Sequence, residues 1–74
     1  MQQEHIRNEQ NAVIGYTMTE GDTIHYFTYK HGQVGQYRTD LQQYTRWKTY
    51  PGHPMAPFKG MDYGMSDVLY WSEH

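Results

Sequence analysis

Cations and aromatic rings alternate in the stretch YTRWKTY, which runs from Tyr44 to Tyr50. Its rings suit stacking on nucleic-acid bases, and Arg46 and Lys48 suit contacts with phosphates. The same residue types also carry much of the binding energy in protein–protein interfaces. The chain has a pI near 6.2 and no RNA-recognition, helix-turn-helix or zinc-finger pattern, whereas nucleic-acid-binding domains are usually basic. A protein partner is therefore the main prediction, and a nucleic-acid-binding module using residues 44–50 is the alternative.

Prolines recur at every third residue in the next stretch, KTYPGHPMAPFKG. The three are Pro51, Pro54 and Pro57. This spacing is that of polyproline II, and the flanking Lys48 and Lys59 satisfy the charge-flanked pattern that SH3-type grooves bind. Gly52 weakens the stiffness that such ligands need. The prolines are better interpreted as stiffening a loop over residues 51–65, which either packs on the core or forms an interaction surface.

Patterns for catalysis and for metal binding are weak. Small ribonucleases use His, Tyr and Arg or Lys as general acids and bases, and the sheet predicted below places His25 opposite Arg38, near Tyr16. The chain has no nucleophile motif, phosphate-binding glycine loop or paired carboxylates, so a ribonuclease-like enzyme is only a second alternative and no catalytic residue is predicted. The five histidines lack ligand spacing and cysteine is absent, so neither a metal site nor a cofactor is predicted.

Composition predicts rings on the surface. The 74 residues suffice for one domain, and without cysteine no disulfide reinforces it. Val, Ile, Leu and Phe together number ten, against eight Tyr, two Trp and five Met. So few aliphatic side chains in so short a chain cannot bury every aromatic ring, because small domains bury a smaller fraction of their surface. The rings left outside are predicted to form a recognition surface.

Charge is divided unevenly along the chain. Five basic residues and one acid lie between Lys30 and Lys59, whereas the rest of the chain is acidic. A basic middle would steer the protein towards an acidic partner, unless its own acidic ends neutralise it. The polar stretch MQQEHIRNEQN has no apolar run typical of a signal peptide, and no segment reaches membrane-spanning length. A cytoplasmic protein without membrane contact is expected.

Three segments rich in β-branched and aromatic residues predict an antiparallel meander over residues 12–19, 23–30 and 33–39. Turns are expected at Glu20-Gly21 and His31-Gly32. Alternation then gives two faces. The better core face contains Ala12, Ile14, Tyr16, Met18, His25, Phe27, Tyr29, Val34, Gln36 and Arg38. The weaker face contains Val13, Gly15, Thr17, Ile24, Tyr26, Thr28, Gly35, Tyr37 and Thr39.

The remaining segments are assigned as follows. Residues 1–11 are predicted to be a flexible polar tail, and residues 12–74 a single small domain. Residues 40–49 suit a helix better than a strand, because Thr39 and Gln42 fit a capping box. On that helix Arg46 would point to solvent. The final SDVLYWSEH is predicted to be a closing edge strand rather than a short helix. The fold class is α+β, a meander sheet of three to four strands with one short helix packed on one face.

The function predicted from these features is non-catalytic binding of a protein partner through an aromatic and basic surface. An inhibitory or accessory factor of phage or mobile-element type is one such class, and homodimerisation is a competing use of the same surface. The predicted partner-binding residues are Tyr26, Tyr37, Arg46, Trp47, Lys48, Tyr50, Phe58 and Lys59.

Overall fold

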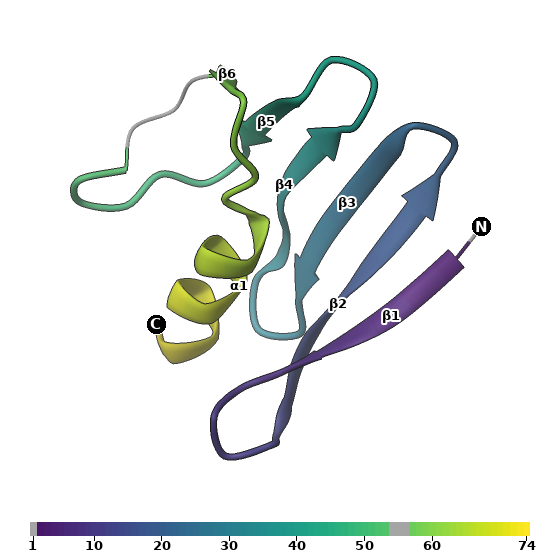
Figure 1. Ribbon diagram of the computed structural model, residues 1–74. Helices are drawn as coiled ribbons and strands as arrows, with labels where there is room; N and C mark the ends of the chain where they lie inside the picture. Colours follow the sequence, from purple (N-terminus) through teal and green to yellow (C-terminus); the bar gives the residue numbers. More distant parts are fainter. Residues whose placement is uncertain (1, 54–56) are drawn as a thin grey trace.

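A computed structural model describes residues 2–53 and 57–74, and in these residues one antiparallel sheet is followed by a C-terminal helix (Figure 1). The elements are β1 (Gln2–Arg7), β2 (Val13–Glu20), β3 (Thr23–Thr28), β4 (Gly32–Arg38), β5 (Gln43–Arg46), β6 (Pro57–Lys59) and α1 (Gly64–Glu73). The strands are neighbours in the order β1-β2-β3-β4-β5-β6, so each pairs with the next along the chain. The predicted α+β class with one helix is confirmed, but the sheet has six strands and not three to four.

The N-terminal segment forms a strand where a flexible tail was predicted. β1 pairs antiparallel with β2, and Ile6, which is 4% exposed, lies opposite Gly15. Burial of one face of a strand strongly specifies its register, and Gly15 has no side chain that would compete with Ile6 for space. The polar residues around Ile6 therefore did not indicate disorder.

Two segments adopt the opposite structure to the one predicted. Residues 43–46 form β5 and not a helix, which aligns Tyr44 and Arg46 on one face of the sheet, where both are buried. Gln42 has φ of 51°, a left-handed conformation that ends any helix starting at Thr39. The C-terminal segment forms α1 and not an edge strand; Asp62 Oδ1 accepts a 2.9 Å hydrogen bond from the Gly64 N–H at its start.

The predicted long loop over residues 51–65 is also broken up. Tyr50 and His53 form an isolated antiparallel bridge, β6 pairs with β5, and α1 begins at Gly64. Pro54 lies outside the described residues, so the structure does not describe the three-proline pattern as a whole.

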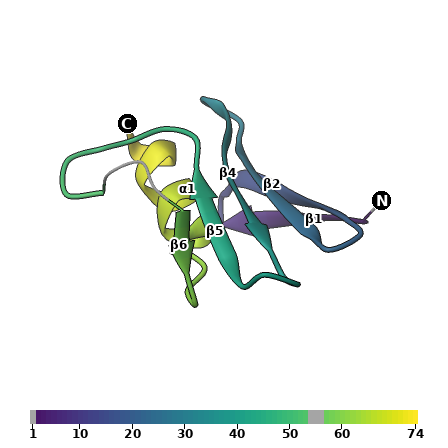
Figure 2. The same ribbon diagram turned by 90° about the horizontal axis from the view of Figure 1, so that it is seen from above.

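The helix covers the face that the sequence marked as weaker. The β2–β3 turn is Gly21-Asp22 and not Glu20-Gly21, because Glu20 pairs with Thr23. This shifts the register by two residues, so the same side chains still share a face. α1 nevertheless packs on the Gly15, Tyr26 and Tyr37 side, and Figure 2 shows it on one side of the sheet.

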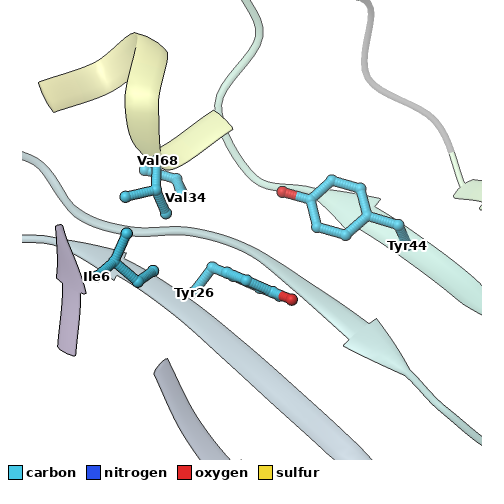
Figure 3. Packing of buried hydrophobic residues seen from close by; sticks show 5 residues of the cluster. All are labelled: Ile6, Tyr26, Val34, Tyr44 and Val68. Atoms are coloured by element: carbon cyan, nitrogen blue, oxygen red, sulfur yellow. The ribbon is translucent and has the colours of Figure 1, made fainter. Parts of the chain in front are cut away.

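The core is small, and among the described residues two of its five buried apolar side chains are tyrosines. Its buried apolar residues are Ile6, Tyr26, Val34, Tyr44 and Val68, from four strands and α1 (Figure 3). Val34 was expected on the opposite face. A β-bulge changes the β3–β4 register next to Tyr26, so Val34 has no strand partner there and its side chain is fully buried in the core.

Glycines explain why this face is the core. A Cβ on Gly35 would contact the Tyr44 hydroxyl and lie 2.6 Å from its Cζ, and a Cβ on Gly64 would overlap the Tyr26 ring. Two tyrosine rings therefore lie where side chains are missing, and the helix approaches closely. We expect Gly35→Ala to destabilise the protein by about 1–3 kcal/mol through overpacking, measured by urea unfolding. Gln36→Ala on the uncovered face is the control, expected to stay within about 0.5 kcal/mol; equal effects of the two substitutions would contradict this explanation.

Candidate functional site

Asp67 on α1 is the centre of the most connected polar group in the described residues. Its side chain is fully buried, and Oδ2 accepts hydrogen bonds from the Tyr44 hydroxyl at 2.6 Å and from Arg46 Nε at 2.8 Å. Oδ1 accepts from the Tyr50 hydroxyl at 2.7 Å and from Arg46 Nη2 at 3.0 Å. Both oxygens of the carboxylate are thus hydrogen-bonded, and these bonds connect α1 to β5 and to Tyr50, which follows β5.

This environment shifts the ionisation of its members. Burial and the hydrogen bond to Asp67 raise the pKa of Tyr50 to about 12 and raise the pKa of Tyr44 further. Burial alone would lower the pKa of Arg46, but its hydrogen bonds to Asp67 and the charge of that residue outweigh burial and raise it. The two tyrosines and Arg46 therefore keep their protons near neutral pH.

Two of the predicted partner-binding residues lie in the interior. Arg46 is 1% exposed, and its Cζ lies 5.0 Å from the centre of the Phe58 ring and 5.3 Å from that of Tyr50. Tyr26 is 6% exposed and donates a 2.6 Å hydrogen bond to Asp62 Oδ2. The expectation that Tyr26 and Arg46 face outwards is wrong, because their own chain supplies the carboxylates and rings that they contact.

The other predicted residues are dispersed. Tyr37 and Phe58 are partly buried and pack against the core. Trp47 is 51% exposed, and Lys59 is exposed on β6. Tyr50 and Lys48 lie on the helix side, where Tyr50 stacks on Tyr70 at 3.9 Å and Lys48 Nζ lies 5.0 Å from the Trp71 ring centre. The structure therefore does not assemble the eight predicted residues into one surface.

A continuous set of rings lies instead on the face of the sheet away from α1, which we call the open face. Tyr16 and Phe27 stack with ring centres 4.7 Å apart and planes at 5°. Tyr29, which is 60% exposed, lies against Tyr16 at 5.4 Å, and His25 lies against Phe27 at 6.5 Å. In sequence this alternating set was recognised but was assigned to the core, so its role as a surface was missed.

The pairing of the strands places three rows of side chains on the open face. One row contains His5, Tyr16, Phe27 and Gln33; the next contains Gln3, Met18, His25, Gln36 and Thr45; the third contains Glu20, Thr23, Arg38, Gln43 and Lys59. Rings and methionine thus occupy two adjacent rows, and the charged side chains lie in the third.

The arrangement suggested for a ribonuclease is not present. His25 lies opposite Gln36, whereas Arg38 lies opposite Thr23 and forms a 2.8 Å ion pair with Asp40. Across residues 2–53 and 57–74, no three His, Asp or Glu side chains are grouped closely enough to hold a metal ion.

Comparisons with protein-family models, curated proteins and solved structures give no match to this chain. Within the described ranges, no helix has the length and apolar character needed to span a membrane.

Proposed function

We propose that this is a non-catalytic binding protein of the cytoplasm that engages a protein partner through the open face. One observation carries the proposal. The single described helix lies on the other face of the sheet, so the stacked rings of Tyr16 and Phe27, with Met18 and Tyr29 beside them, have no layer of the described residues over them. An antiparallel sheet with one solvated face normally carries polar residues there, and a cluster of rings on that face favours a contact with another molecule.

The distribution of residue types on the open face resembles that of a protein interface. Tyr, Phe and Met are enriched at the centres of such interfaces, and charged residues lie at their rims. Here the rings and Met18 occupy two adjacent rows, and Glu20, Arg38 and Lys59 lie in the row that borders them on one side.

Charge favours a protein over a nucleic acid on this face. Arg38 is already paired with Asp40, and Glu20 lies in the same row, so few cations remain for phosphates. One face of the Tyr16 ring also stacks on one face of the Phe27 ring, so these two faces are closed to bases. In this proposal the protein acts by occupying its partner, as an inhibitory or accessory factor of phage or mobile-element type would.

Site-specific photo-crosslinking in source cells tests this. A benzophenone side chain is introduced at Gln36 or Thr45 on the open face and, as the matched control, at exposed Ser66 on α1. We expect one protein adduct from both open-face positions and none from Ser66. Equal adducts from Ser66, or adducts to nucleic acid, would contradict the proposal.

The partner so identified allows an affinity test. We expect Tyr16→Ala to weaken binding by about thirtyfold, as for a central aromatic residue worth about 2 kcal/mol. Thr23→Ala, in the charged border row, should change the affinity less than about threefold, because rim contacts contribute little. Calorimetry on variants with wild-type circular dichroism measures both. Equal losses for the two variants would mean that the rings are not the centre of the contact.

A further inference from the structure

We propose that the outer edge of β1 accepts an extended segment of a partner protein as an added strand. β1 is the first strand of the sheet and pairs only with β2 among the described strands, so its other edge is free (Figure 1). A free edge presents a row of backbone N–H and C=O groups that bind another strand. This goes beyond the proposed function, because it uses a sheet edge and not the open face.

The two edges of the sheet differ in their protection. β6 has only three residues, and these include Pro57, which has no N–H to donate, and Lys59, which discourages pairing. β1 has six residues with neither proline nor lysine, and every one of them is paired on the β2 side. The irregularity in the β1–β2 pairing lies in β2, where Ile14 is skipped, so β1 itself stays regular. β1 therefore lacks the short length, the proline and the lysine that protect the outer edge of β6.

A cavity beside β1 would take a side chain of the added strand. It has a volume of about 340 Å³. Its lining includes Glu4, Ile6, Ile24, Tyr26 and Met65 on the helix side of the sheet, and it extends to Arg7 at the end of β1. The Met65 side chain, in the first turn of α1, is 48% exposed at this cavity. Binding by strand addition takes its affinity from the backbone and its specificity from such a pocket next to the edge.

The side chains of β1 define the chemistry of the added strand. Glu4 and Ile6 face the helix side, and alternation places Arg7 on the other face. Opposite charges and apolar pairs directly across a strand pair are favourable. An antiparallel partner strand therefore has the sequence acid–apolar–any–base from its N-terminus. The acid lies opposite Arg7, the apolar residue lies opposite Ile6 next to the cavity, and the base lies opposite Glu4.

A second copy of β1 does not meet this requirement. Residues directly opposite each other in an antiparallel pair share a face, so Glu4 of one copy never lies opposite Arg7 of the other. Symmetric pairing about Glu4 places two carboxylates together, pairing about His5 places Glu4 against Ile6, and pairing about Ile6 places Arg7 against His5. None of these registers places Glu4 against a lysine or an arginine. Like charges across strands are destabilising, so the charges favour a different chain.

The test uses the peptide TTDITKTT, added to the intact, isotope-labelled protein and followed by NMR. We expect saturable shifts of the backbone amides of Gln3 to Arg7 and of the methyl groups of Ile6, Ile24 and Met65. A peptide whose alternate amides are N-methylated on the edge that faces β1 should bind at least about tenfold more weakly, because it loses two or three hydrogen bonds to β1. Replacing its lysine with glutamate should also weaken binding, by about threefold to tenfold.

Each other outcome overturns the proposal. The first is no shift in β1 at about 1 mM peptide, because an affinity weaker than that is too low to be useful. The second is equal binding of the N-methylated peptide, and the third is shifts confined to the open face. The fourth is shifts in β1 that depend on protein concentration without peptide, which would assign the edge to a second copy. The open face is tested independently by the crosslinks from Gln36 and Thr45. A failure of the peptide to bind β1 would therefore not affect the proposed function of the open face.

Discussion

Replacing Asp67 with alanine is expected to remove about 3–5 kcal/mol of stability, the usual cost of breaking a buried ion pair. The substitution leaves the buried Arg46 guanidinium without its carboxylate and removes the acceptor of the Tyr44 and Tyr50 hydroxyls. A domain of 74 residues has a total free energy of unfolding of about 4–11 kcal/mol. The loss is therefore a large share of the total, and urea unfolding followed by circular dichroism measures it.

A double variant separates the cost of the unpaired Arg46 charge from the loss of packing. Arg46→Met with Asp67→Leu removes both charges and keeps similar volumes. Such replacements of buried ion pairs are often neutral, so we expect the double variant to be more stable than Asp67→Ala by at least about 2 kcal/mol. If Asp67→Ala costs less than about 1 kcal/mol, or if the double variant is the less stable of the two, the bonds to Asp67 do not hold α1 on the sheet.

Local patterns in the sequence predicted the central strands well. The alternation of β-branched and aromatic residues located β2, β3 and β4, and, apart from Val34 beside the β-bulge, the two sets of side chains that share a face follow from that alternation. Which set is buried does not follow from it. The decision rests on Gly35 and Gly64, whose missing side chains admit the rings of Tyr44 and Tyr26. A comparison of the apolar side chains on the two faces favoured the wrong face, because a glycine contributes no side chain to that comparison.

The candidate site was harder to predict because its contacts are distant in sequence. Arg46 was assigned to a solvated helix face, and its partner Asp67 lies 21 residues further along the chain. In β5 the two-residue period turns Tyr44 and Arg46 to the same side, and α1 then places Asp67 over both. No local pattern marks such a pair, since a cation in a ring-rich segment equally suits a surface.

Alkaline pH is expected to unfold the protein steeply between about pH 10 and 12. Burial and hydrogen bonds to aspartates raise the pKa of Tyr26 and of Tyr44 above the ordinary value, and the pKa of Tyr50 to about 12. The folded state thus holds these phenolic protons more tightly than the unfolded chain, whose tyrosines titrate near 10. Their stabilisation is complete below about pH 10 and is lost as the pH rises towards the folded values, by about 1.4 kcal/mol per pH unit for each buried tyrosine.

Single hydroxyl deletions identify which tyrosines cause this loss. Urea unfolding from pH 8 to 11.5 should show a steep fall in free energy of unfolding above pH 10 for the wild type. In Tyr44→Phe the slope should be smaller by about 1.4 kcal/mol per pH unit, because one retained proton is gone. Tyr29→Phe, whose side chain is 60% exposed, should keep the wild-type slope. An unchanged slope in Tyr44→Phe would show that the hydroxyl beside Asp67 is not sequestered. The helix would then owe its position to apolar packing alone.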